Sequence, residues 1–148
     1  RIVVQRVSHA SVTIEGQCKS SIGKGMLILV GIEESDGQED IDWLCKKIVN
    51  LRIFDDENGI MNRSILETAG EILAVSQFTL MARTKKVTVL YIDAAKPEIS
   101  IPLYEKFVQL LQKELQKEIK TGVFGADMQV GLINDGPVTI IIDSKNRL

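Results

Sequence analysis

The sequence predicts one mixed α/β domain, residues 1–148, in which two long helices pack on an antiparallel, barrel-like sheet. Two segments repeat apolar residues at helical spacing, and about seven others have the apolar, β-branched composition of strands. The strand segments are joined mostly by turns, which favours antiparallel pairing. The length of 148 residues is typical of a single domain.

The first strands are predicted in the N-terminal quarter of the chain. Residues 2–7 and residues 12–14 are two β-rich runs, and residues 15–17 (EGQ) form a tight turn after them. Residues 26–32 (MLILVGI) are apolar without interruption. That pattern indicates a strand buried on both faces.

The first helix is predicted to begin at a capping box. Asp36 is the expected cap, and Glu39 follows three positions later. Apolar residues then recur at helical spacing as far as Ile48, with charged residues on the other side. Residues 50–54 are predicted to form a strand, and residues 55–59 a turn around Asn-Gly.

Further strands are predicted on both sides of the second helix. Residues 71–81 (EILAVSQFTLM) form a strong strand pattern, and Pro97 and Pro102 bracket the start of the helix. The helix has an apolar stripe made by Leu103, Phe107, Leu110 and Leu111. Residues 128–133 and 138–142 are predicted as two strands separated by a turn.

Composition excludes several classes of function. His9 is the only histidine, and Cys18 and Cys45 are isolated from each other, so we predict neither a metal site nor a cofactor. With a net charge of −2, any contact with RNA is expected through a local basic patch. No signal peptide or membrane segment is predicted, so we expect a cytoplasmic protein.

Two polar motifs are candidates for a site. SQFTL (76–80) ends a buried strand, where polar side chains must be hydrogen-bonded or face a cleft. The alternative is a strand that simply turns into solvent. In NDGPVT (134–139), Pro137 cannot occupy a central ladder, so it marks a break, a bulge or a cis bond, with an ordinary hairpin turn as the alternative.

Together these motifs resemble those of the D-aminoacyl-tRNA deacylases, also called D-tyrosyl-tRNA deacylases. Residues 2–16, 51–64 and 121–130 are similar to the same family in the same order, so the resemblance covers nearly the whole chain. Residues 87–91 (VTVLY) depart from the family pattern, which has Gly and Pro there. The pattern resumes at Asp93.

The resemblance implies a D-aminoacyl-tRNA deacylase-like fold and a symmetric homodimer with its active sites at the interface. It also implies hydrolysis of D-aminoacyl-tRNA, and of glycine mischarged on tRNA, to free amino acid and tRNA. Ser76, Met128 and Asn134 would bind the 3′ aminoacyl end. Gly136 and Pro137, joined by a cis bond, would reach into the partner's pocket.

A mechanism without a strong nucleophile fits these residues. Backbone N–H groups of Gln77, Phe78 and Thr79 are candidates to stabilise the oxyanion while water attacks, assisted by the substrate's 2′-hydroxyl. A rigid Gly-Pro wall would reject L-aminoacyl esters by steric clash. The alternatives are an esterase that depends on Thr79 and a non-catalytic RNA-binding β-barrel module.

A basic cluster follows the SQFTL motif. Arg83, Lys85 and Lys86 are the candidates for contact with tRNA phosphates. The alternative for this cluster is a solvated loop.

Overall fold

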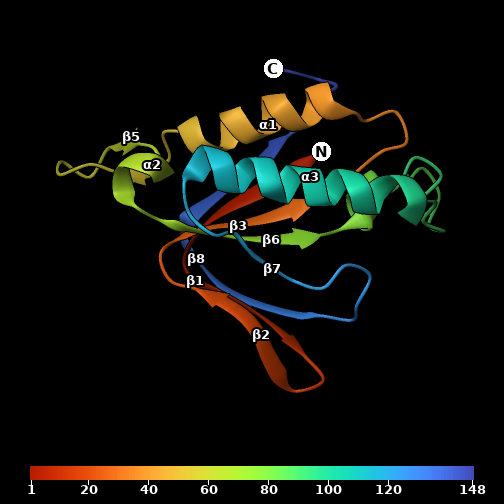
Figure 1. Ribbon diagram of the computed structural model, residues 1–148, viewed down its shortest axis with the longest axis horizontal. Helices are drawn as coiled ribbons and strands as arrows, with labels where there is room; N and C mark the ends of the chain where they lie inside the picture. Colours follow the sequence, from red (N-terminus) through yellow and green to blue (C-terminus); the bar gives the residue numbers. More distant parts are fainter.

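The computed structural model describes residues 1–148 and confirms the mixed α/β class. Figure 1 shows the two long helices lying side by side over one side of a curved sheet. In chain order the elements are β1 (Ile2–Ile14), β2 (Gln17–Ile22), β3 (Gly25–Val30), α1 (Gln38–Asn50), β4 (Phe54–Asp55), β5 (Met61–Arg63), α2 (Ile65–Thr68), β6 (Glu71–Ser76), the 3₁₀ helix η1 (Phe78–Met81), α3 (Pro97–Leu115), β7 (Lys120–Thr121) and β8 (Gln129–Ile142).

The sheet is built around β1. This strand pairs antiparallel with β2, β3 and β8, as predicted. The pairs β3–β6 and β6–β7 are parallel, so the expectation of antiparallel pairing is wrong for this half of the sheet. The physical reason is that α1 and α3 serve as crossover connections, which return the chain to the same end of the sheet.

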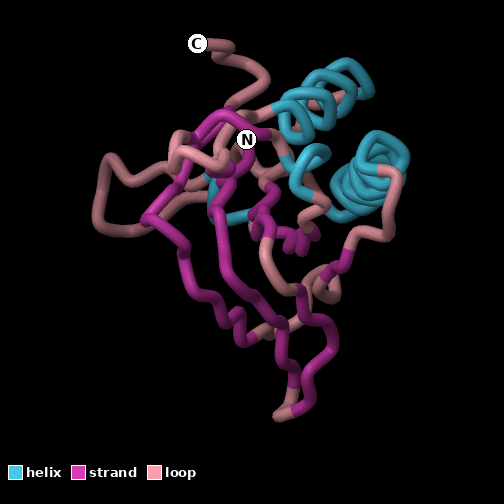
Figure 2. Tube along the Cα trace, turned by 90° about the vertical axis from the view of Figure 1, so that its left-hand side faces the viewer, coloured by secondary structure: helices cyan, strands magenta, loops and turns pink.

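The sheet curls into a nearly closed barrel. The first half of β1 pairs with β3 and its second half with β2, so β1 belongs to both sides of the curl. Ser20 Oγ on β2 donates to the carbonyl of Thr121 on β7 at 2.7 Å, which joins the two edges. Figure 2 shows the long strands reaching away from the helices, which lie together on one side.

Apolar side chains form a core on each side of the sheet. Met26 and Ile28 of β3 pack with Phe107 of α3 in the core beneath the helices. Leu27 points the other way, into the smaller core inside the curl with Val12. The prediction that this strand is buried on both faces is therefore confirmed.

The first helix begins one residue later than expected. Gly37 precedes α1, and its N–H donates to the Asp40 carboxylate at 2.9 Å. Asp36, the predicted cap, instead accepts the N–H of Glu33 at 2.9 Å. The capping prediction is wrong because the Asp36 carboxylate accepts an N–H of the preceding loop and not one of the helix.

Several strand predictions differ from the structure in their bounds. Residues 2–14 form one long strand, and so do residues 129–142. In the region 50–54, α1 continues to Asn50, and regular pairing is confined to Phe54 and Asp55. The strand predicted over 71–81 ends at Ser76, and η1 follows it. None of the helices has the length and apolar character needed to cross a lipid bilayer.

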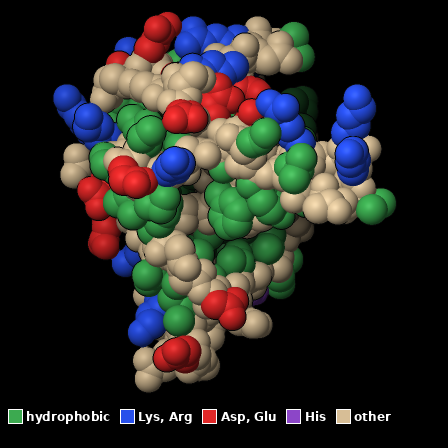
Figure 3. All heavy atoms as spheres, turned by 90° about the vertical axis from the view of Figure 1, so that its right-hand side faces the viewer, with side chains coloured by type: hydrophobic (Ala, Val, Ile, Leu, Met, Phe, Trp, Pro, Cys, Tyr) green, Lys and Arg blue, Asp and Glu red, His purple; other side chains and the backbone are tan.

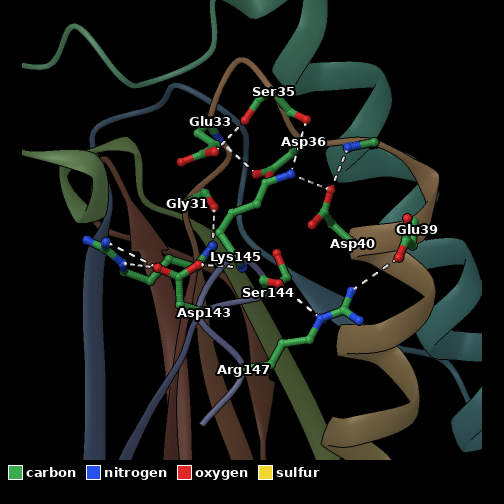
Figure 4. A network of polar contacts seen from close by, with 12 residues as sticks. Gly31, Glu33, Ser35, Asp36, Glu39, Asp40, Asp143, Ser144, Lys145 and Arg147 are labelled. Atoms are coloured by element: carbon green, nitrogen blue, oxygen red, sulfur yellow. Dashed lines mark hydrogen bonds and ion pairs between the residues drawn. The ribbon is translucent and has the colours of Figure 1, made fainter.

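The C-terminal segment is tied to the start of α1 by ion pairs (Figure 4). Lys145 Nζ lies 3.1 Å from the Asp40 carboxylate and 3.6 Å from that of Asp36. Burial alone would raise the pKa of Asp40, but hydrogen bonds from Gly37 and Lys145 bring that pKa below its usual value. For Asp36 burial dominates, and its pKa is raised.

Candidate active site

A cavity of about 530 Å³ opens at the carboxyl end of β6. Figure 3 looks onto this side of the molecule, where hydrophobic side chains gather in the middle of the face. Its walls come from β3, the end of β6, the start of α3 and the segment that leads into β8. The polar or motif-bearing residues that line it include Ser76, Gln77, Phe78, Ser100, Asp127 and Met128.

The structure brings four of the predicted site residues to this cavity. They are Ser76, Gln77, Phe78 and Met128. Ser76 is half-buried, and its hydroxyl has no hydrogen-bond partner within the chain. A polar group in that position is available to a ligand, which favours the cleft interpretation of the SQFTL motif over a strand turning into solvent.

The backbone amides after β6 are not equivalent. The N–H of Gln77 donates to the carbonyl of Val30 at 2.7 Å, so it is already occupied within the sheet. The N–H groups of Phe78 and Thr79 have no backbone or side-chain acceptor. Of the three predicted oxyanion donors, these two remain free to bind a ligand.

Thr79 has no activating base. Its hydroxyl accepts a hydrogen bond from the side-chain amide of Gln77, and it makes no hydrogen bond to a carboxylate, lysine or histidine. Thr79 also does not line the cavity. A threonine hydroxyl without a base is a weak nucleophile.

The cavity also contains residues that the motifs did not predict. Phe124 packs against Tyr104 with ring centroids 5.7 Å apart, and Ser100 lies on the first turn of α3. Asp127 is the one carboxylate in the lining. Phe124 and Asp127 both lie in the run TGVFGADMQV, so the similarity of residues 121–130 was the signal that pointed to this wall.

The Gly-Pro segment forms a bulge on β8. Val7 pairs with Asn134 and Gln5 with Thr139, so residues 135–138 stand opposite Arg6 alone. The Gly136–Pro137 peptide bond is cis, as the resemblance implied. The bulge explains how a strand accommodates a residue that lacks an N–H.

Arg6 holds the bulge from inside the sheet. Its side chain is 9% exposed, and it donates to the carbonyl of Asp135 at 2.7 Å and to that of Ile53 at 2.7 Å. Gly136 has a φ of +149°, and a methyl group there would lie 2.9 Å from the Val138 backbone nitrogen. Glycine is therefore required at this position.

The side chain of Asn134 also stabilises the bulge, through hydrogen bonds to Val138 and Thr139. Its Oδ1 accepts the N–H of Val138 at 2.7 Å, and its Nδ2 donates to the Val138 carbonyl at 3.2 Å and to Thr139 Oγ1 at 3.0 Å. The amide predicted to contact substrate thus makes its hydrogen bonds within its own strand. Asn134, Gly136 and Pro137 do not line the cavity of their own chain.

One of the three basic residues predicted to contact tRNA is in an ion pair, and the other two are not. Arg83 binds both carboxylate oxygens of Asp93, at 2.6 and 2.7 Å, and this bond lowers the pKa of Asp93. Lys85 and Lys86 are exposed and take part in none of the ion pairs of the structure. The two lysines are therefore the free cations of this loop.

These features define a class of small α/β domain in which a curled sheet carries a cavity of about 530 Å³ beside free backbone amides. Residues 3–143 match the family described as D-Tyr-tRNA(Tyr) deacylase. The chain belongs to this family.

Relatives span the same length as this chain. A D-aminoacyl-tRNA deacylase of Bacteroides thetaiotaomicron is 78% identical over 99% of both chains, and one of Parabacteroides distasonis is 64% identical over the same share. A solved structure described as c-Myc DNA Unwinding Element Binding Protein is 43% identical, with a TM-score of 0.90, covering 94% of this chain and 95% of its own. A probable eukaryotic D-amino acid tRNA deacylase, 15% identical, has a TM-score of 0.81 over 94% and 96% of the two chains, which shows the shared fold.

Proposed function

We propose that this chain is a D-aminoacyl-tRNA deacylase that hydrolyses the ester at the end of β6 and releases free D-amino acid and tRNA. The observation that carries the proposal is the cavity of about 530 Å³ beside the free amides of Phe78 and Thr79. The 78% identical relative bears the same name. The reaction belongs in the cytoplasm, where aminoacyl-tRNA is used.

The cavity has the size of the aminoacylated 3′ end of a tRNA and is far too small for the rest of the molecule. Its volume falls in the range of about 300–1,000 Å³ that is typical of small-molecule sites. The terminal aminoacyl-adenosine would enter, and the rest of the tRNA would stay outside. Ser76 would hydrogen-bond the substrate through its unpaired hydroxyl, and Met128 would pack against it.

Hydrolysis requires no covalent intermediate with the protein. Water adds to the ester carbonyl, and its proton passes through the 2′-hydroxyl to the 3′-oxygen as the ester C–O bond breaks. Phe78 and Thr79 would stabilise the oxyanion through their N–H groups, because fixed donors bind the charge that develops in the transition state. Gln77 would order this turn through its bond to the Thr79 hydroxyl.

Chirality would be read by the bulge of a second copy. Gly136 and Pro137 face outward and lie away from their own cavity, so a homodimer would place them at the partner's site. Ile133 and Ile141 on the same strand are 54% and 69% exposed, an apolar surface that a second copy would cover. A main-chain wall would reject L side chains and accept D-amino acids and glycine.

Release of tyrosine from D-tyrosyl-tRNA and from L-tyrosyl-tRNA tests the activity. We expect hydrolysis of the D ester and little of the L ester. Equal turnover of both would refute chiral proofreading. No turnover of either would favour the non-catalytic RNA-binding module.

Gly136→Ala tests the wall, with Gly23→Ala as the control. A methyl on Gly136 collides with Val138, whereas the space around Gly23 is open. We expect Gly136→Ala to lose activity or to lower the ratio of D to L turnover. An unchanged rate and ratio would count against the wall.

A mixing experiment tests the shared site. Gly136→Ala carries an intact cavity, and a cavity variant such as Met128→Trp carries an intact bulge. After unfolding and refolding together, mixed dimers would contain one complete site and regain activity. No gain over the separate variants would contradict a site made from two subunits.

A further inference from the structure

Two aromatic rings lie exposed at the mouth of the cavity. Phe78 is 59% exposed and Tyr91 is 39% exposed, and their ring centroids are 5.0 Å apart in an edge-to-face arrangement. Phe78 also lines the cavity. Rings that remain in water at the rim of a site are available to stack on a ligand.

The fold fixes the main chain that carries both rings. Phe78 begins η1, directly after β6. Tyr91 is held by the turn in which the N–H of Ala94 donates to its carbonyl at 3.1 Å. The loop between the rings is closed at its base, because Arg83 and Leu90 exchange two backbone hydrogen bonds, at 2.8 and 3.1 Å.

The loop between the two rings also carries two unpaired cations. Lys85 and Lys86 project from the same loop without ion-pair partners, in a chain whose net charge is −2. Flat aromatic faces beside free lysines match the chemistry of a single-stranded nucleic acid, which offers bases to stack and phosphates to neutralise.

We infer that Phe78 and Tyr91 form a stacking site for the unpaired base that precedes the terminal adenosine, with Lys85 and Lys86 facing the adjoining phosphates. The inference rests on the proposed function and adds a second nucleotide subsite to it. The cavity would take the terminal nucleoside, and the next base would meet the rings at its rim.

Two substrates of different length separate this subsite from the catalytic cavity. D-tyrosyl-adenosine ends at the terminal nucleoside, whereas D-tyrosyl-tRNA continues past it. We expect Tyr91→Ala to raise KM for D-tyrosyl-tRNA about 5- to 150-fold, the range for loss of one base-stacking contact, with kcat unchanged. Hydrolysis of D-tyrosyl-adenosine should stay at the wild-type rate.

Matched variants show whether the ring itself matters. Tyr91→Phe keeps the aromatic face and should restore the wild-type KM. Ile92→Ala removes an exposed apolar side chain next to Tyr91 and should leave the hydrolysis of both substrates unchanged. The double change Lys85→Glu and Lys86→Glu should raise KM for the tRNA ester and weaken its dependence on salt.

Some results would overturn the inference. An equal effect of Tyr91→Ala on both substrates would place Tyr91 in the cavity, and no effect on the tRNA ester would remove the subsite. A changed sedimentation coefficient for Tyr91→Ala would mean that the rings pack against a second copy.

Direct binding separates failure of the subsite from failure of the proposed function. Wild-type protein that hydrolyses neither ester would refute the deacylase. The subsite is then tested by titrating uncharged tRNA into wild type and Tyr91→Ala. Weaker binding by the variant would support the stacking site, and equal binding would refute it.

Discussion

Replacing Arg6 by methionine would show how strongly the bulge of β8 depends on one buried cation. Methionine keeps the apolar stem and removes the guanidinium, so the carbonyls of Asp135 and Ile53 each lose a donor at 2.7 Å. A hydrogen bond from a charged group contributes about 1.5–3 kcal/mol, and two give about 3–6 kcal/mol. The Asp55 carboxylate, 3.4 Å away, is 53% exposed and adds little.

Urea unfolding followed by Trp43 fluorescence measures this loss. In thermal unfolding of a domain of this size, about 3–6 kcal/mol corresponds to a fall in Tm of roughly 6–24 °C. Arg52→Met is the control, because Arg52 also donates to a carbonyl, that of Asn62 at 3.1 Å, but on the exposed surface. If the two variants unfold within about 1 kcal/mol of each other, Arg6 does not hold the bulge.

Three further experiments probe the packing and the chemistry. Burial raises the pKa of Cys45 to about 12, so at pH 8 a thiol reagent should modify only the exposed Cys18 in the folded protein. In urea both thiols should react. Two reactive thiols in the folded protein would contradict this expectation. Gly25→Ala should prevent stable folding, because its methyl would lie 1.8 Å from the Glu71 carbonyl, whereas Gly23→Ala should melt like wild type. Thr79→Ala should keep appreciable deacylase activity, since no base contacts the hydroxyl; complete loss with normal melting would support covalent catalysis.

Local sequence patterns predicted the helices and strands that a short run of residues is enough to specify. The apolar stripe ending at Leu111 identified α3, and the uninterrupted run from Met26 identified the doubly buried β3. The two motifs pointed to the family, which matches residues 3–143, and to the end of β6 as the candidate site. Pro137 alone predicted a break, a bulge or a cis bond, and the structure has both a bulge and a cis bond there.

Contacts between distant residues could not be read from the sequence. The N–H of Gln77 is occupied by Val30, which is 47 positions earlier, so the choice among the three amides needed the tertiary structure. The sequence analysis assigned no role to Arg6, which is buried and donates to the carbonyl of Asp135, 129 positions later. Parallel pairing of β3 and β6 likewise depends on where α1 returns the chain.

The central place of β1 has a consequence for how the molecule acquires its shape. β1 is the first strand, and it pairs along nearly its whole length with β8, the last strand. During synthesis one edge of β1 therefore has no neighbour until β8 has been made. Folding should complete in a single late step, slowed by the long loop that must close, and a chain interrupted before β8 would expose an unpaired, aggregation-prone strand.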